Sequence, residues 1–270
     1  MPIDLTILVP ASNAQEVVSP LIQALGNILP QFAASVEVLI VDDASTDLTM
    51  ARVRALLTGR SWLRLLRVER PEGKGNAISA GIRAANGRWI ALLDTDRRYD
   101  VSDLLGMWQR ARRGEADWFQ GRREPPAANR LEDHVTRPLE RLLLADRTAD
   151  PGCGLRMFQA SIGPKLPLQY RGLLRFLPVY ASRLGYSVAE HPVRWTPDAD
   201  ARGDLSFLER LWGGLLDLLA VRWMFARVGD PASVELRLPR HFSETSVREE
   251  HAGAPPRATA TLPPRDPAVR

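Results

Sequence analysis

The chain has 270 residues, of which 45% are hydrophobic and 25% are charged, and its formal net charge at pH 7 is +4. This length suits one large α/β domain, alone or with an appendage, and leaves little room for two full domains. The single cysteine, Cys153, excludes an intrachain disulfide. We expect no signal peptide and no spanning helix, because apolar runs of about 18 uncharged residues are absent. A cytoplasmic location is therefore the default.

The first 95 residues alternate between strand-like and helix-like segments. Strands are predicted at residues 5–9, 36–41, 63–68 and 89–93, and the first two are continuous apolar runs of the kind found in buried parallel strands. Helices are predicted between them, at roughly residues 14–29 and 48–57 and from the loop at 72–76 to about 85. Such alternation is typical of a parallel sheet with helices on both faces, where ligands bind at the carboxyl ends of the strands.

The second half of the chain has a weaker pattern. Residues 122–150 are charged and helix-prone, residues 188–193 are strand-like, and residues 207 to about 225 form a helical segment rich in leucine and tryptophan. We take residues 1–228 as one domain. Residues 243–270 carry many prolines, alanines and arginines with few apolar anchors, which predicts a disordered tail.

Two carboxylates directly follow the fourth predicted strand, in the sequence Asp94-Thr95-Asp96. Carboxylates one residue apart at a strand end can hold a divalent cation whose other ligands are diphosphate oxygens. The same short pattern occurs in many surface turns. Its position after a buried strand nevertheless favours a metal site.

Two further loops, at Asp42 and at residues 73–76, fall at the same predicted edge of the sheet, and a third glycine-containing loop comes later in the chain. Asp42 ends the second strand, where its carboxylate could accept a hydrogen bond from a nucleobase or a ribose hydroxyl, although capping a turn is an equally ordinary role there. Residues 73–76 (Gly-Lys-Gly-Asn) could present backbone N–H groups and a lysine to phosphate, but they lack the spacing of a Walker loop. Residues 150–156 contain two glycines, and this loop either shapes an acceptor pocket or simply turns.

Together these motifs resemble those of glycosyltransferase family 2. The resemblance rests on Val9-Pro10, VDDASTDLT at residues 41–49, GKGNAISAG at 73–81 and Asp94-Thr95-Asp96. Residues 150–158 (DPGCGLRMF), 175–178 (RFLP) and 211–223 (LWGGLLDLLAVRW) look like a bacterial branch of the polyprenyl-phosphate glycosyltransferases, the dolichol-phosphate mannosyltransferase type. The likeness covers roughly residues 3–228. It implies a GT-A fold, which is a Rossmann-like, mostly parallel central sheet with helices on both faces.

The resemblance implies a binding site for a nucleotide-sugar donor. Pro10, Ile40 and Asp42 match positions that hold the base and the ribose of the nucleotide. Asp94 and Asp96 match the positions for a Mg²⁺ or Mn²⁺ ion and the diphosphate.

The resemblance also implies a polyprenyl phosphate acceptor. Arg123 matches an arginine placed to hold the acceptor phosphate, and Arg202 lies where the family has a basic residue near the phosphates. The implied reaction is inverting attack of the lipid phosphate on the anomeric carbon, with release of a nucleoside diphosphate.

Three departures from the family pattern fall at functional positions. Ala14 replaces an acidic residue, although Glu16 follows two residues later; Arg98 replaces a glutamine; and Asp204 replaces a phosphate-contacting lysine. These changes keep an alternative open, namely an impaired family member that binds a nucleotide sugar or a lipid phosphate as a partner protein. A nucleotidyltransferase is disfavoured because no basic, glycine-rich loop follows the first strand. No basic-aromatic motif supports nucleic-acid binding.

The leucine- and tryptophan-rich helix has a distinctive face. Trp212, Leu216, Leu219 and Trp223 are three or four residues apart and so share one side of the predicted helix. This side either packs on the sheet as core or lies in the headgroup region of a membrane, where tryptophan and arginine are favoured. Because the implied acceptor is a lipid, we predict a peripheral protein on the inner face of the membrane.

Overall fold

The computed structural model describes residues 2–70, 73–95, 98–124, 133–168, 170, 172–196 and 207–227. The side chains of residues 98, 133–135 and 207–210 are excepted. All of these residues belong to one compact unit, Met1–Pro231. The predicted disordered tail, residues 243–270, lies outside the described residues.

Among the described residues, eight strands form one sheet in the spatial order β3-β2-β1-β4-β7-β6-β8-β5. In chain order the strands are β1 (Leu5–Ala11), β2 (Val36–Asp43), β3 (Leu63–Val68), β4 (Trp89–Leu93), β5 (Arg98–Tyr99), β6 (Trp118–Glu124), β7 (Leu155–Gln159) and β8 (Val188–Thr196). The β1–β2, β1–β4, β2–β3 and β6–β8 pairs are parallel, whereas β7 and β5 pair with their neighbours in the antiparallel sense. The predicted α/β class with a mostly parallel sheet is confirmed.

Strand β1 runs through the centre of the parallel half of the sheet. All seven of its residues are buried, because helices cover the sheet on both sides. This explains why the segment is a continuous apolar run and does not alternate between apolar and polar residues. In the parallel register Ala11 lies opposite Asp42, so the carboxyl ends of β1 and β2 meet at one edge.

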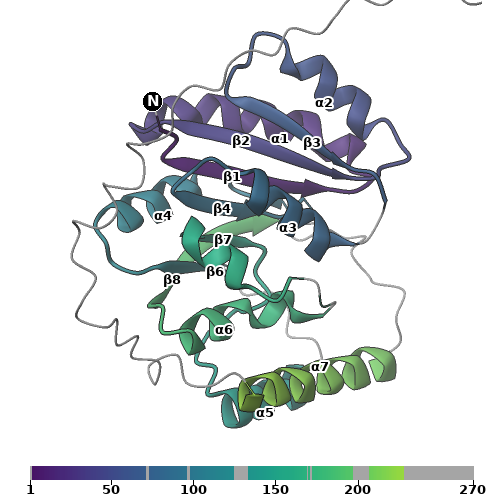
Figure 1. Cartoon of the computed structure of the whole chain (residues 1–270), viewed down its shortest axis with the longest axis vertical. Helices are drawn as coiled ribbons and strands as arrows, with labels where there is room; N and C mark the ends of the chain where they lie inside the picture. Colours follow the sequence, from purple (N-terminus) through teal and green to yellow (C-terminus); the bar gives the residue numbers. More distant parts are fainter. Residues whose placement is uncertain are drawn as a thin grey trace, which may run out of the picture. The chain divides into compact units, whose positions relative to one another are not determined.

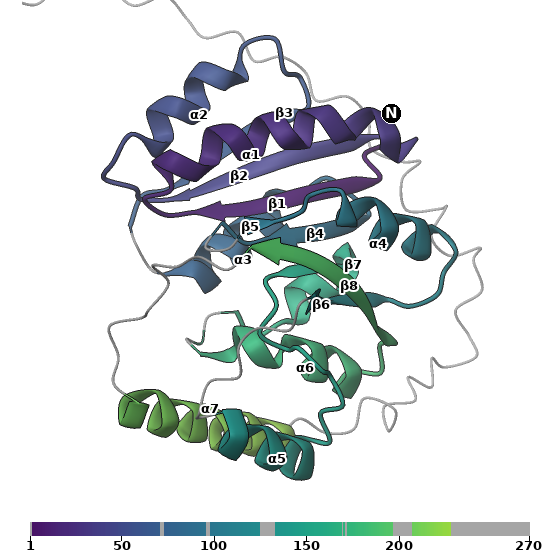
Figure 2. The same cartoon turned by 180° about the vertical axis from the view of Figure 1, so that it is seen from behind.

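The two faces of the sheet carry different helices (Figures 1 and 2). One face is covered by α1 (Gln15–Ile28), α2 (Thr49–Leu57) and α4 (Asp103–Arg112). The opposite face is covered by α3 (Lys74–Ala84) and α6 (Leu177–Arg183). Short 3₁₀ helices complete the chain at η1 (Leu29–Phe32), η2 (Ala160–Lys165) and η3 (Leu173–Phe176).

Helices α5 (Asp133–Leu144) and α7 (Phe207–Arg227) lie side by side and away from the parallel strands (Figures 1 and 2). Their inner sides share an apolar cluster with η3 and α6, which consists of Leu144, Leu173, Phe176, Val179, Leu218, Val221 and Phe225. Helix α7 occupies the segment for which the sequence predicts a helix. The α5–α7 pair is therefore joined to the sheet through η3 and α6.

Candidate active site

The carboxylate of Asp94 lies at the end of β4, paired with a lysine from α3. Its Oδ2 accepts a hydrogen bond from Nζ of Lys74 at 2.6 Å. Lys74 is the first residue of α3 and follows Gly73, whose φ of 97° is a backbone conformation that favours glycine. Both side chains are partly exposed. The pair thus brings one negative and one positive charge to the carboxyl edge of the sheet.

Gly154 allows the loop before β7 to approach Asp94 closely. A Cβ atom at this position would lie 2.5 Å from Cβ of Asp94, which is closer than two such atoms can approach. The backbone N–H of Gly154 donates a hydrogen bond to the hydroxyl oxygen of Tyr99 at 2.8 Å. The loop at residues 150–154 is therefore held across the end of β4, and here the absence of a side chain is a steric requirement.

These elements enclose a cavity of about 200 Å³. Its lining contains one carboxylate, Asp94, and three cationic side chains, Lys74, Arg156 and Arg175. The other lining residues are Pro10, Ile78, Leu92, Gly152, Gly154 and Leu174. A cavity with this excess of positive charge suits a ligand with several negative charges, such as a diphosphate.

Arg156 is a cavity residue that the sequence motifs did not single out. It is buried within β7, and its Nε and Nη2 donate to the backbone carbonyls of Cys153 and Pro151, each at 3.0 Å. Burial lowers the pKa of its guanidinium. The available signal was an arginine among the apolar residues Leu155, Met157 and Phe158, since a buried arginine needs a specific reason to be there.

Asp42 is buried at the end of β2 without a hydrogen bond to either carboxylate oxygen from the residues that the structure describes. The nearest cation that the structure describes is Nε of Arg67, 3.8 Å from Oδ2. An unsatisfied buried carboxylate is costly, and the nucleotide contact implied by the family resemblance stays a prediction for this residue. Asp42 is opposite Ala11, next to Pro10 in the cavity wall, and is therefore close to the same edge.

Two other predicted nucleotide contacts differ in placement. Pro10 lines the cavity, and its carbonyl accepts a hydrogen bond from Oγ1 of Thr95 at 3.0 Å, which ties the ends of β1 and β4 together. The side chain of Ile40 is fully buried in the core cluster of the sheet and is not part of the cavity wall. The structure thus brings Pro10, but not the Ile40 side chain, to the site.

Arg123, the predicted acceptor-phosphate residue, is engaged within the protein. Its Nε and Nη2 donate to the two carboxylate oxygens of Asp150, each at 2.6 Å, and its side chain is 8% exposed. Burial opposes its charge, but the hydrogen bond and charge of Asp150 outweigh this and raise the pKa of Arg123. It approaches the cavity through Gly152, where a Cβ would lie 3.4 Å from its Nη2. Its role toward a phosphate stays a prediction.

Several residues named in the sequence analysis lie outside the described part of the chain. They are Asp96, Arg202 and Asp204, and for Arg98 the side chain alone. Glu16 is described, with a side chain that is 77% exposed and 3.4 Å from Nη2 of Arg52. Glu16 is not among the residues that line the cavity.

The described part of the site offers one ligand for a divalent cation, because Asp94 has a partly exposed carboxylate beside the cavity. The ammonium group of Lys74 already lies against this carboxylate. The described residues contain no group of three or more histidine, cysteine, aspartate or glutamate side chains arranged to hold a metal ion. Mg²⁺ is commonly held by one or two carboxylates together with substrate phosphates, and this donor set is compatible with such binding.

The fold is similar to that of a solved structure. It matches glucosyl-3-phosphoglycerate synthase from Mycobacterium tuberculosis with a TM-score of 0.62 and 19% identity, over 84% of this chain and 81% of that chain. At this identity the likeness shows the expected GT-A fold alone. Crystal structures of that synthase include complexes with Mn²⁺ and uridine-diphosphate-glucose.

The family follows from the sequence. The model for glycosyl transferase family 2 matches residues 6–162, and this chain belongs to that family. The family membership expected from the motifs is confirmed.

Several characterised or named proteins are similar. Dodecaprenyl-phosphate galacturonate synthase from Rhizobium johnstonii is 28% identical over 81% of this chain and 66% of its own length. Succinoglycan biosynthesis protein ExoO from Rhizobium meliloti is 41% identical over 40% of this chain, and glycosyltransferase AglD from Haloferax volcanii is 26% identical over 75%. The matches span 30% of ExoO and 35% of AglD, so this chain covers less than two thirds of each relative.

Proposed function

We propose that this protein is an inverting glycosyltransferase that moves a sugar from a nucleoside-diphosphate sugar to a polyprenyl phosphate. The observation that carries the proposal is the cavity at the carboxyl edge of the sheet, where Asp94 lies with Lys74, Arg156 and Arg175. Membership of glycosyl transferase family 2 supports the reaction class, and the name of the Rhizobium johnstonii relative supports a polyprenyl phosphate acceptor.

The reaction requires stabilisation of a leaving diphosphate more than it requires a strong base. An oxygen of the acceptor phosphate forms the new bond to the anomeric carbon, and the bond from that carbon to the donor diphosphate breaks. The electron pair leaves with the nucleoside diphosphate. Because the attacking oxygen is already anionic, positioning and charge neutralisation dominate the barrier. A single displacement inverts the anomeric configuration.

The donor occupies the side of the cavity next to β1, β2 and β4 in this proposal. Asp42 accepts a hydrogen bond from the nucleoside, with Pro10 and the Ile40 segment beside it. Asp94 and Asp96 would hold a Mg²⁺ or Mn²⁺ ion, which would neutralise charge on the leaving diphosphate. Lys74 lies within hydrogen-bonding distance of Asp94, at the start of α3, where the helix dipole also favours an anion.

On the acceptor side, Arg123 and Arg202 keep the phosphate-binding role that the family resemblance implies. For Arg123 the described contacts use one N–H of Nε and one of Nη2, so the phosphate is bound by the N–H groups that remain.

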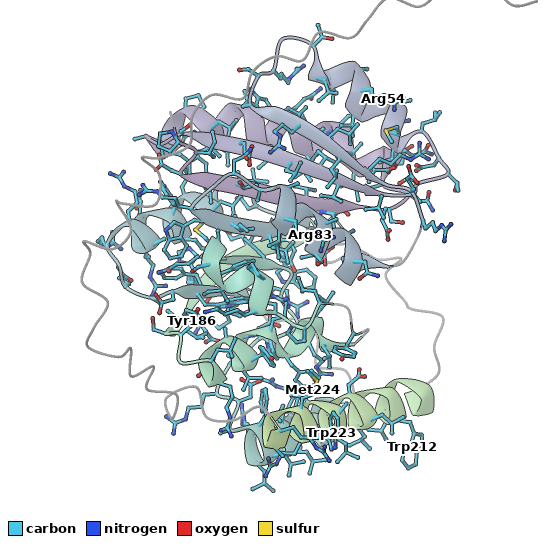
Figure 3. The ribbon with its side chains drawn as sticks, in the orientation of Figure 1. Arg54, Arg83, Tyr186, Trp212, Trp223 and Met224 are labelled. Atoms are coloured by element: carbon cyan, nitrogen blue, oxygen red, sulfur yellow. The ribbon has the colours of Figure 1, made fainter. Side chains whose placement is uncertain are left out.

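The outer face of the α5–α7 pair supports a membrane-bound acceptor. Trp212 and Trp223 are 62% and 59% exposed and project from the outer side of α7 (Figure 3). Leu216 and Leu219 on α7 and Leu142 on α5 are also exposed. The exposed residues of these two helices and of the loop after α5 include arginines at positions 141, 147, 222 and 227. Among the described residues, no helix is long and apolar enough to cross a membrane.

We therefore propose a peripheral protein on the inner face of the membrane, bound through this outer face. Indole rings favour the headgroup region, and guanidinium groups attract anionic lipids. The matched test is flotation with anionic liposomes at low and high salt, comparing wild type with Trp212→Ala/Trp223→Ala and with Leu48→Ala, an exposed apolar residue near α2. Wild type and Leu48→Ala should float at low salt. If the double variant floats equally well, the face does not bind membranes.

The catalytic proposal is tested with purified full-length protein. Nucleotide sugars are first screened for a rise in melting temperature with Mn²⁺, with Mg²⁺ and with EDTA, since a ligand that binds the folded state raises it. The donor that binds is then assayed with a polyprenyl phosphate, and the anomeric configuration of the product is determined by NMR. Donor binding without transfer or hydrolysis would instead favour the alternative of an impaired, binding-only family member.

A further inference from the structure

We infer that Arg175 binds the phosphate of the lipid acceptor. This inference rests on the proposed function, and it assigns a specific role to a residue outside the strand-end motifs. Arg175 belongs to η3, which precedes α6, and it lines the cavity together with its neighbour Leu174.

Arg175 is the described cavity arginine with the greatest remaining capacity to bind a ligand. Its side chain is 28% exposed, and its Nη2 donates to Oε1 of Glu140. No other hydrogen bond of its guanidinium is made to the described part of the chain. By contrast, Arg156 is 4% exposed and donates from Nε and Nη2 to two carbonyls, and the Arg123 side chain is 8% exposed and donates from Nε and Nη2 to Asp150. A guanidinium has five N–H donors, so Arg175 has one more left for a phosphate than either of these, and its greater exposure makes its donors accessible.

Glu140 holds Arg175 in place from α5. The Glu140 side chain is fully buried, and its Oε2 accepts from Nη1 of Arg137 at 3.0 Å. Burial raises the pKa of Glu140, which the two arginines oppose. Arg137 is also fixed, because its Nη2 donates to the carbonyls of Thr148 and Ala149. The Arg175 guanidinium is thus oriented before any ligand arrives, which reduces the entropy cost of binding.

The neighbours of Arg175 favour the acceptor over the donor. On one side Arg175 lines the cavity, and on the other it meets α7, since a Cβ at Gly214 would lie 3.8 Å from its Nη1. Asp217, also on α7, lies against Gly172 just before η3; burial raises the pKa of its carboxyl and the charge of Arg175 opposes this. The side of α7 that faces away from η3 carries the exposed residues Trp212 and Trp223. A ligand with a phosphate next to a long apolar chain requires a cation and an apolar surface that one chain can reach. Among the described cavity cations, Lys74 on α3 and Arg156 on β7 are part of elements on the sheet, whereas Arg175 adjoins the α5–α7 pair.

The first experiment measures binding directly, using farnesyl phosphate as the probe and farnesol as the probe without phosphate. Titration is carried out on the full-length protein and on Arg175→Gln/Glu140→Gln, which removes both members of this ion pair, while Arg137 keeps Asp146 at 3.8 Å and the carbonyls of Thr148 and Ala149. Arg183→Ala on α6 is the matched control, because Arg183 is exposed and does not line the cavity. Uridine and guanosine diphosphate report on the donor site.

We expect the double variant to bind farnesyl phosphate about 10- to 100-fold more weakly, the loss typical of a hydrogen bond to a charged group. Nucleoside diphosphate binding should stay near the wild-type value, and Arg183→Ala should match wild type for both probes. Equal loss of both ligands would assign Arg175 to the donor diphosphate and overturn the inference. Unchanged binding of farnesyl phosphate, or no preference of wild type for farnesyl phosphate over farnesol, would overturn it as well.

A second measurement separates this inference from the proposed function. In the transfer assay, Arg175→Lys keeps the charge but loses the planar fork of donors, so it should raise KM for the acceptor with little change in KM for the donor. A wild-type protein that binds farnesyl phosphate through Arg175 but transfers no sugar would refute the proposed function and leave the phosphate site standing.

Discussion

The two halves of the molecule contribute to the cavity in different ways. In the first half, β1, β2 and β4 are parallel neighbours or near neighbours, and Asp42 and Asp94 stand at or next to their carboxyl ends. In the second half, Arg156 comes from within the antiparallel strand β7, and Arg175 comes from a 3₁₀ helix that packs under α7. The first arrangement follows from strand order alone, whereas the second depends on packing between distant segments.

The halves also differ in how they satisfy their charges. Asp42 in the first half is buried without a hydrogen-bond partner among the described residues, with Arg67 3.8 Å away, and we propose that it binds the nucleotide. In the second half, Arg123 is paired with Asp150, and Arg137 and Arg175 share Glu140. Substitutions in the first half should therefore affect ligand binding more than stability. Substitutions in the second half should affect stability first.

The largest expected effect is on stability in the second half. Arg123→Ala leaves the mostly buried carboxylate of Asp150 without its partner, and we expect a loss of about 3–5 kcal/mol in the free energy of unfolding. Urea denaturation measures this loss. The neutral pair Arg123→Met/Asp150→Asn should recover most of it.

The same neutral pair decides whether Arg123 also binds substrate. The role implied by the family resemblance predicts that a stable Arg123→Met/Asp150→Asn protein still has a raised KM for the acceptor, with a smaller change for the donor. A stable variant with normal acceptor kinetics would make Arg123 a structural residue alone.

The next effect is catalytic and lies in the first half. Asp94→Asn should lower turnover about 100-fold or more, because a charge-stabilising group is lost, while the melting temperature stays close to that of wild type. We expect the same of Asp96→Asn. The control is Glu69→Gln, an exposed acid after β3 that should retain full activity. Normal turnover in Asp94→Asn would refute the site, and transfer that persists in EDTA would indicate that other cations replace the metal.

A smaller effect tests the contact between the two halves. Gly154→Ala places a Cβ 2.5 Å from Cβ of Asp94, so the loop or the carboxylate has to move, at a cost of about 1–3 kcal/mol. We expect reduced turnover together with a lower melting temperature. Gly213→Ala is the matched control, because its Cβ would meet no atom within 4 Å and alanine favours a helix. If both variants behave alike, the close approach at Gly154 is not required.

The smallest expected change has opposite signs for stability and for binding. Asp42→Asn removes a buried charge that lacks a hydrogen bond, so the free energy of unfolding should stay constant or rise by about 1 kcal/mol. Binding of nucleoside diphosphate should weaken about tenfold in the same variant. Thermal melts and calorimetric titration check the two signs. A destabilised variant with normal nucleotide binding would make Asp42 a structural residue.

The parallel half of the fold and its acidic edge could be predicted from the sequence alone. Continuous apolar runs predicted β1 and β2, and loops directly after strands predicted that Asp42 and Asp94 would lie at the carboxyl edge. These features depend on short stretches of sequence. Burial on both faces dictates the residue types of a parallel strand, and the chain direction fixes which end of the strand carries the loop. The family motifs in the same segment are also short stretches and were recognisable there.

The positions of Arg156 and Arg175 in the cavity wall, and the exposure of one face of α7, could not be predicted from the sequence and follow from tertiary packing. A heptad-like spacing placed Trp212 and Trp223 on one side of a helix, but it did not say whether that side met the sheet or solvent. The answer depended on which opposite residues of α7, such as Leu218 and Val221, packed against η3 and α6. Likewise, a carboxylate on α5 and an arginine 35 positions later form one buried pair, Glu140 and Arg175, through packing that no local pattern encodes.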